Sequence, residues 1–180
     1  MSEENKDKTL EEYLARIANG DSSALEALYL ETKSSVFGFA LSILKNAPDA
    51  EDILQDTYVK IWSQAEKYEP QGKPLAWMLT MVRNMCMSKF RAESKTANIN
   101  EEEWQLFYSE SPEVTNEDRI VLEAAMQKLS DTDRQIFMLH AVAMLKHWEI
   151  AEIFDMPLST ELSRYNRAKK KLYEILKEGY

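Results

Sequence analysis

Few residues in this chain could carry catalytic or metal chemistry. The two histidines, His140 and His147, stand seven residues apart in helical sequence, with no third ligand or nucleophile at a matching spacing. The single cysteine, Cys86, lies between two methionines and is expected to pack in a core or an interface. No glycine-rich phosphate loop is present. We therefore predict no catalytic residue, no metal site, no cofactor and no enzyme.

A tight acidic patch is a better candidate, for binding rather than for catalysis. At helical spacing, one face of the segment around residues 49–65 is apolar and carries Ile53, Leu54, Thr57, Tyr58, Ile61, Trp62 and Ala65. The opposite face carries Glu51, Asp52, Gln55, Asp56 and Val59. Asp49 is expected to cap this helix. Spacing alone favours a solvated acidic face, and a docking surface for a cationic partner is the alternative.

The charge is distributed unevenly along the chain, although the net charge is -9. Two stretches, Pro70 to Ala92 and Leu162 to Tyr173, contain no acid; their cations are Lys73, Arg83, Lys89, Arg91, Arg164, Arg167, Lys169, Lys170 and Lys171. Between them, Glu93 to Asp118 holds eight acids and one lysine. This layout predicts two nucleic-acid-facing modules joined by an anionic connector.

The composition favours an all-α protein, because 180 residues include only four glycines and five prolines. Periodicity predicts helices over 10–17, 24–44, 49–67, 75–91, 116–129, 130–144, 146–154 and 159–177. We expect a four-helix bundle at 1–92, an acidic linker at 93–115 and a helix-turn-helix domain at 116–180. The linker contains an apolar island of Trp104, Leu106, Phe107 and Tyr108.

Two segments could contact nucleic acid. Residues 149–160 have the pattern of a helix, a short turn and a new helix cap, typical of a helix-turn-helix whose second helix enters the major groove. A solvated basic helix end is the alternative. Near the loop at 68–74, Trp77 could stack an unpaired base, but a Trp in a Met-rich helix more often belongs to the core.

No run of about 18 apolar residues occurs, so we expect no membrane insertion. The charged N-terminus leads to no apolar stretch and does not have the pattern of a signal peptide. With a single cysteine excluding an internal disulfide, the expected location is cytoplasmic.

Three segments, in this order, resemble the extracytoplasmic-function class of bacterial sigma factors. Residues 49–62 are similar to the family's polymerase-binding helix. Residues 68–91, with Pro74-Leu75-Ala76-Trp77, Arg83-Asn84 and Arg91, are similar to its promoter −10 region. Residues 129–172, with Arg134, Glu149-Ile150-Ala151, Pro157, Thr160, Ser163-Arg164 and Arg167-Ala168, are similar to its −35-binding domain.

The resemblance implies a sigma factor that binds core RNA polymerase, through the β′ clamp helices and the β subunit, and directs −10 melting of promoter DNA. It implies polymerase binding by Asp52, Gln55, Asp56 and Val59. It implies −10 DNA binding by Lys73, Trp77, Arg83, Asn84, Lys89 and Arg91. It implies −35 DNA binding by Thr160, Ser163, Arg164, Arg167 and Lys171. An anti-sigma factor is a further implied partner.

The sequence departs from the family pattern after Thr160, where an apolar and then a basic residue are usual and Glu161 and Leu162 stand here. If Glu161 faces DNA, its charge repels phosphates by about 1 kcal/mol or more. Two alternatives therefore stay open. One is a helix-turn-helix regulator that acts without polymerase, and the other is a sigma-like interaction protein that does not initiate transcription.

Overall fold

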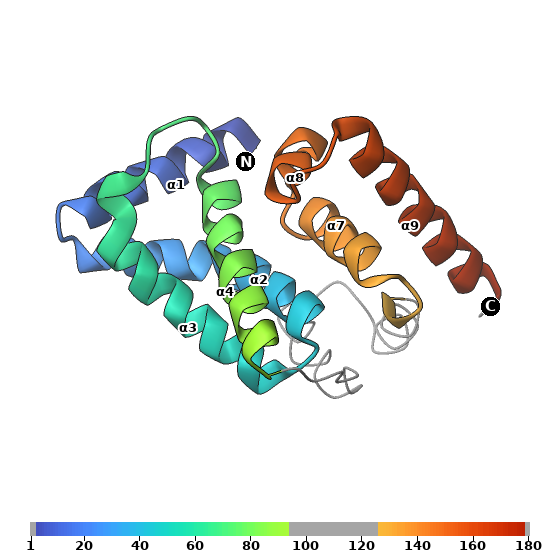
Figure 1. The fold of residues 1–180 in the computed structure, drawn as a ribbon. Helices are drawn as coiled ribbons and strands as arrows, with labels where there is room; N and C mark the ends of the chain where they lie inside the picture. The colour runs from blue at the N-terminus through green and yellow to red at the C-terminus, as the bar shows by residue number, and fades with distance from the viewer. Residues whose placement is uncertain (1–2, 94–125, 179–180) are drawn as a thin grey trace.

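The computed structural model describes residues 3–93 and 126–178 (Figure 1). Within these ranges every regular element is a helix, which confirms the predicted all-α class. The same part of the chain contains no helix of the length and apolarity needed to cross a membrane. The predicted apolar island at Trp104 to Tyr108, and the helix predicted to begin at 116, fall outside the described residues apart from 126–129.

The N-terminal bundle consists of α1 (Glu3–Ala18), α2 (Ser22–Leu44), α3 (Ala47–Gln64), the short 3-10 turn η1 (Ala65–Lys67) and α4 (Pro74–Glu93). Helix α2 is the central element and packs against α1, α3 and α4. The largest fully buried side chains of the bundle are Leu10, Leu14, Ile17, Leu28, Phe39, Leu41, Ile61, Met78 and Leu79. Cys86 is buried in this core, as predicted. The packing of this core fixes the positions of the exposed faces of α3 and α4.

Polar groups order the bundle at two places. Asp21 caps α2 by accepting hydrogen bonds from the backbone N–H groups of Ser23 and Ala24. Inside the core, the Thr32 and Tyr58 hydroxyls lie 2.7 Å apart and join α2 to α3. Burial raises the pKa of the Tyr58 hydroxyl well above its ordinary value. This hydrogen bond satisfies two hydroxyls that would be costly to bury alone.

The start of α3 differs from the prediction. The cap is Asn46, whose side chain accepts a hydrogen bond of 2.9 Å from the backbone N–H of Asp49. Asp49 therefore lies in the first turn of the helix, where its charge favours the positive end of the dipole. Its carboxylate is left free to reach another helix.

The C-terminal domain contains α7 (Asp131–Ala141), α8 (His147–Ile153) and α9 (Leu158–Glu178). Ser130, the first residue of the helix predicted over 130–144, caps α7 by accepting a hydrogen bond from the backbone N–H of Asp133. Helices α8 and α9 pack against each other in the predicted helix-turn-helix, and Ala151 of α8 is buried. Helix α7 packs against both and completes a three-helix unit.

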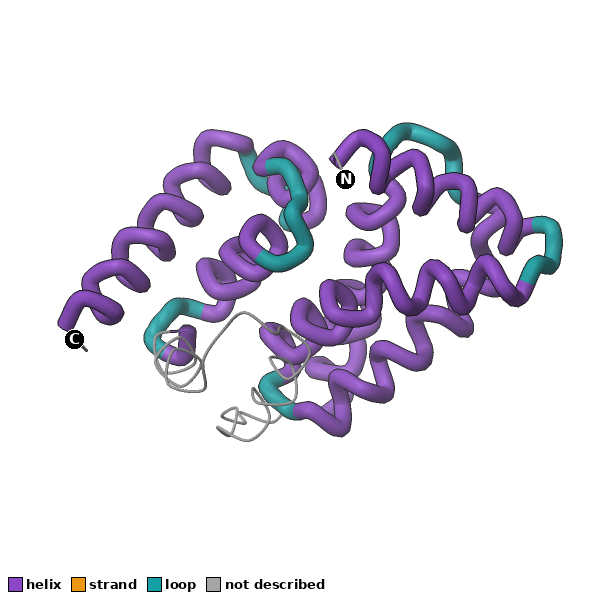
Figure 2. Tube along the Cα trace, turned by 180° about the vertical axis from the view of Figure 1, so that it is seen from behind, coloured by secondary structure: helices purple, strands orange, loops and turns teal. Residues whose placement is uncertain are grey.

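The two bundles pack side by side, as both views show (Figures 1 and 2). Helix α7 lies against α2, and α8 lies against α4. At the α2–α7 contact, Lys45 Nζ is 2.7 Å from Asp131 Oδ1. The arrangement is closed, and α8 is the element of the C-terminal domain that faces the α4 surface.

The turn between α7 and α8 holds Met144 in the left-handed region, with φ 59. This region costs a residue with a Cβ roughly 1–2 kcal/mol, whereas glycine adopts it freely. We expect Met144→Gly to raise the free energy of unfolding by about 0.5–1 kcal/mol, after subtracting the larger entropy of glycine in the unfolded chain. Thermal denaturation measures this. The control Ala141→Gly, in the last turn of α7, should destabilise the protein instead.

Candidate nucleic-acid interface

The exposed face of α3 carries the residues for which the resemblance implies polymerase binding. Glu51, Asp52, Gln55 and Asp56 are exposed, and Val59 is 70% exposed. The other face is buried through Ile53, Thr57, Tyr58 and Ile61. The chain thus displays carboxylates and an amide beside an exposed valine, on a helix held rigidly by its core face.

Trp62 was predicted to be buried, and this was wrong, because it is 43% exposed. It lies one turn beyond Val59, at the boundary between the buried and the exposed face of α3. Trp62 stands three residues after Val59, and this spacing in the sequence indicated that Trp62 lies near the exposed face. An exposed tryptophan beside exposed carboxylates gives the face an apolar anchor of the kind that concentrates binding energy at interfaces.

Lys89 of α4 joins the acidic face of α3 to the predicted −10 surface. Its Nζ lies 2.6 Å from Asp49 Oδ1 and 3.2 Å from Asp52 Oδ2. The hydrogen bond with Asp49 is the main cause that raises the pKa of Lys89. The structure therefore brings together a residue implied for −10 DNA and one implied for polymerase, which the sequence placed in separate groups.

A cavity of about 320 Å³ lies between the loop after η1, α4 and α8. Tyr68 and Trp77 line it with ring centroids 5.2 Å apart. Trp77 was expected to belong to the core, but it is only half-buried and faces this cavity. Aromatic rings beside Lys73 make a surface on which an unpaired base could stack.

Glu11 of α1 holds the loop beside the cavity, a role that the sequence did not reveal. One carboxylate oxygen accepts hydrogen bonds of 2.8 Å from the Tyr68 hydroxyl and from the backbone N–H of Gly72. Burial, followed by the bond to Glu11, raises the pKa of Tyr68 to about 12. Gly72 has φ 68, which suits glycine at this bend. Since 57 residues separate Glu11 from Tyr68, no local pattern could indicate the contact.

We expect Glu11→Ala to weaken binding of −10 single-stranded DNA about three- to tenfold, because the loop loses two hydrogen bonds each worth about 1 kcal/mol. Fluorescence anisotropy with a labelled oligonucleotide measures this. Glu12→Ala is the matched control, since Glu12 is exposed. Equal effects of the two substitutions would contradict the role of Glu11.

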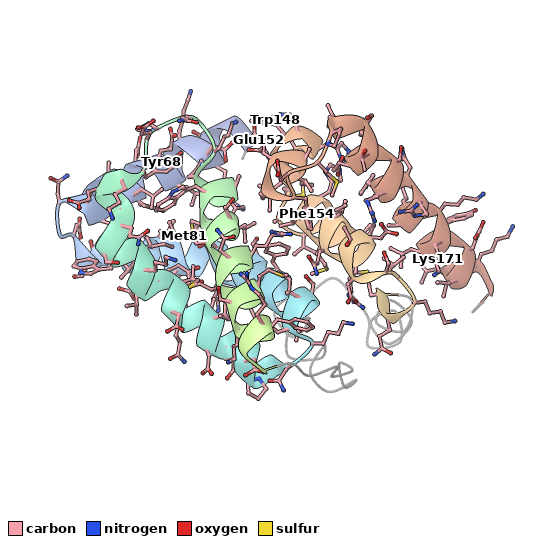
Figure 3. All side chains as sticks on the ribbon, viewed as in Figure 1. Tyr68, Met81, Trp148, Glu152, Phe154 and Lys171 are labelled. Carbon is pink, nitrogen blue, oxygen red and sulfur yellow. The ribbon has the colours of Figure 1, made fainter. Side chains whose placement is uncertain are left out.

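Helix α8 covers part of the implied −10 surface (Figure 3). Lys73 Nζ lies 3.2 Å from Glu152 Oε2 and 3.9 Å from the centroid of the Trp148 ring. The Arg83 guanidinium lies over the Phe154 ring at 4.9 Å. Each contact joins a cation of the N-terminal bundle to the C-terminal domain. In this arrangement Lys73 and Arg83 have partners inside the protein.

The remaining implied −10 residues stay accessible on α4. Asn84 and Arg91 are exposed, together with Thr80 and Ser88, at spacings that form one stripe along the helix. The Arg91 Nε donates to the Met87 carbonyl at 3.1 Å, which leaves the rest of the guanidinium outward. Thr80 was not predicted among the residues of this stripe, although it lies four residues before Asn84 and therefore on the same face of the helix.

The implied −35 residues divide into two groups. Thr160 and Ser163 are exposed in the first turns of α9. Arg164 and Arg167, by contrast, both bind the buried Asp133 of α7: Arg164 Nη1 at 3.0 Å, and Arg167 with Nε and Nη2 each at 3.1 Å. Burial alone would raise the pKa of Asp133, but the bonds from Arg167, Ser130 and Arg164 outweigh it and hold that pKa below its ordinary value.

The implied −35 residues do not all lie on the outward face of α9. Lys171 Nζ donates to the Lys128 carbonyl at 2.5 Å and, like Arg164, lies on the side of the helix toward α7. Ser159, Thr160, Ser163, Asn166, Arg167 and Lys170 are among the exposed positions of residues 158–170. The i, i+4, i+7, i+11 spacing of Ser159, Ser163, Asn166 and Lys170 was the signal for this face.

Glu161 does not face the outward surface. Its side chain is fully buried, so the expected repulsion of DNA phosphates is not supported. The two histidines are both half-buried and stack with ring centroids 4.2 Å apart. No group of acidic, histidine or cysteine side chains suited to a metal ion occurs in the residues 3–93 and 126–178.

Two known families match the chain, in order along the sequence. Sigma-70 region 2 matches residues 28–96, and Sigma-70, region 4 matches residues 119–172. The ECF RNA polymerase sigma factor SigK of Mycobacterium ulcerans (strain Agy99) is 30% identical over 171 residues, which cover 91% of each protein. The SigK of Mycobacterium sp. (strain KMS) is 28% identical over 163 residues, covering 86% of this chain and 84% of that protein.

Two solved structures share the fold. CnrH in complex with the cytosolic domain of CnrY matches with a TM-score of 0.70 at 19% identity, covering 96% of this chain and 99% of CnrH. The sigma factor RpoE of Bartonella quintana, in complex with the anti-sigma factor NepR, matches with a TM-score of 0.65 at 24% identity, covering 84% of this chain and 96% of RpoE.

Proposed function

The chain belongs to the extracytoplasmic-function class of the sigma-70 family, and we propose that it binds polymerase through α3 and promoter DNA through α4 and α9. As a sigma factor it directs promoter-specific transcription initiation and is not an enzyme. The observation that supports the assignment of surfaces is the order of the two family regions, since region 2 covers α3 and α4 and region 4 covers α7 to α9. We place its action in the cytoplasm, with core RNA polymerase.

Polymerase binding is assigned to the exposed face of α3, through Asp52, Gln55, Asp56 and Val59, with Trp62 added on its exposure. The implied partner is the β′ clamp helices. Carboxylates on a rigid helix pair well with arginines of a partner helix, and complementary charge steers the encounter. An anti-sigma factor that binds the same face would compete with polymerase.

DNA binding is assigned to two surfaces. The −10 strand would contact the wall of the cavity formed by the loop and α4, at Lys73 and Trp77, and continue along α4 past Arg83, Asn84, Lys89 and Arg91. The −35 duplex would receive the outward face of α9, with Thr160, Ser163 and Arg167. Arg164 would hold the helix against α7, and Lys171 would hold it against the residues just before α7. We assign residues 1–92 to polymerase and −10 binding, 93–115 to the linker and 116–180 to −35 binding.

The closed arrangement has a consequence for this function. Lys73 and Arg83 are bound by side chains of the C-terminal domain, so the −10 strand must compete with these partners while α8 is in place. We propose that α8 and α4 separate when the factor joins polymerase and promoter. When only a small fraction of a protein is in the state that binds a ligand, the apparent dissociation constant is the intrinsic one divided by that fraction.

The function is tested by run-off transcription with purified core polymerase on a library of random promoter sequences. We expect the factor to select templates that share two short elements at a fixed spacing. If polymerase binds the factor but no template is selected, the chain is a sigma-like interaction protein. If DNA is selected without polymerase, it is a helix-turn-helix regulator.

A further inference from the structure

Glu161 is a buried carboxylate at the start of the helix that is assigned to the −35 element. Its side chain is fully buried in the first turn of α9. A buried carboxylate is costly unless hydrogen bonds or an opposite charge compensate it. An apolar side chain would fill the same buried position without that cost, so burial alone does not explain a glutamate.

The partner of Glu161 is His147, the first residue of α8. Glu161 Oε1 lies 3.0 Å from His147 Nδ1, and Glu161 Oε2 has no hydrogen-bond partner within the described residues. The pair therefore links the beginnings of the two helices of the helix-turn-helix. Buried pairs of this kind contribute little net stability but can specify one geometry.

The pair is held in place by α7. The His147 ring stacks on the His140 ring at 4.2 Å, with an angle of 17° between them. His140 Nδ1 lies 2.8 Å from the Leu145 carbonyl, and because a carbonyl only accepts, His140 must donate there. Tyr165 of α9 lies edge-on to both rings, at 4.7 and 4.8 Å. Side chains from two neighbouring helices, His140 of α7 together with Glu161 and Tyr165 of α9, thus fix where the His147 ring lies.

This cluster lies on the inner side of the turn that presents Ser159, Thr160 and Ser163 outward. First-turn residues of a recognition helix read base edges, and their hydrogen bonds depend on the rotation and depth of that helix. A polar link between the starts of α8 and α9 sets both quantities, because its length and direction are restricted by the hydrogen bond. An apolar contact would allow the helix to slide or rotate.

We propose that Glu161 is a positioning residue for −35 recognition, acting through His147. The inference rests on the proposed function, since it assumes that α9 reads the −35 element. The link sets base discrimination by the first turn of α9, and overall stability depends on the apolar contacts of Ile136, Leu139 and Ile150, which are fully buried.

The test uses holoenzyme and a promoter selected by the unaltered factor, together with variants of that promoter carrying single-base changes in the −35 element. Run-off transcription gives the discrimination against each change. Glu161→Gln, which keeps an oxygen to accept from His147, should retain the discrimination within twofold. Glu161→Leu should reduce it at least fivefold at the positions read by the first turn. Glu174→Gln, an exposed acid farther along α9, is the control.

A second variant covers the case in which Glu161→Leu fails to fold. The double substitution Glu161→Leu with His147→Phe replaces the pair by apolar groups that can still stack on His140, and it should fold while showing the same loss of discrimination. Unchanged base preference in the folded leucine variants would overturn the inference, and so would an equal loss in Glu161→Gln. Failure of the unaltered factor to select any promoter would refute the proposed function instead.

Discussion

Replacing Asp52 and Asp56 with lysine is expected to lower the affinity for core polymerase at least 100-fold and to abolish promoter-dependent transcription. Both side chains are exposed on α3, so the core beneath them is unaffected. Close charge pairs at protein interfaces couple by about 1.5–7 kcal/mol, and reversal turns such attraction into repulsion. Biolayer interferometry with immobilised core polymerase measures the affinity.

Asp56 provides the cleaner single substitution. Asp52 also binds Lys89, so Asp52→Lys changes the neighbouring DNA surface as well. The control is Glu26→Lys with Glu31→Lys, two exposed acids on α2 that reproduce the change in net charge. Similar loss of binding in the control would mean that net charge, rather than the face of α3, decides docking. Unchanged affinity of the Asp56→Lys variant would exclude the assigned role.

Removing the charge of Glu152 is expected to strengthen DNA binding, whereas the substitutions on α3 are expected to weaken polymerase binding. Glu152→Gln together with Trp148→Ala removes both partners that hold Lys73 against α8. A partly exposed ion pair contributes about 0.2–1 kcal/mol and a cation–π contact about 0.5–1 kcal/mol. Together they correspond to roughly tenfold tighter binding of −10 single-stranded DNA by the free factor, since the open state becomes more populated.

Fluorescence anisotropy with a −10 oligonucleotide measures this gain. Asp155→Asn is the matched control, because it removes one negative charge three residues from Glu152 in the exposed turn after α8. A side-chain amide also tolerates the left-handed backbone at this position, where φ is 50. An equal gain in the control would attribute the effect to net charge and contradict the covering role of α8.

Much of the fold was predictable because it depends on local patterns. The apolar period of α2 and α3, the Ser130 cap and the turn before α9 each lie within a few residues of what they determine. The predicted cap of α3, Asp49, lies three residues after the observed cap, Asn46. Both residue types are good caps, and the sequence does not rank them. Trp62 was misplaced because it lies at the edge of the apolar face.

The sites were less predictable because tertiary contacts decide them. The residue types and the helices of the proposed surfaces could be read locally. The pairing of Arg164 and Arg167 with Asp133, the contact of Lys73 with Glu152 and the burial of Glu161 could not. Each depends on a tertiary contact between different segments of the chain, and the contacts of Arg164 and Glu161 turn these side chains away from the surface that their spacing suggested.

The central claim is that −10-binding residues covered by α8 in the free factor become exposed during initiation. Pulsed electron paramagnetic resonance tests it most directly, with spin labels attached after Glu31→Cys on α2 and Glu174→Cys on α9. Cys86 should stay unlabelled, because burial raises the pKa of its thiol to about 12. We predict a single distance in the free factor and a longer distance in the complex with polymerase and promoter. The same distance in both states would contradict the claim.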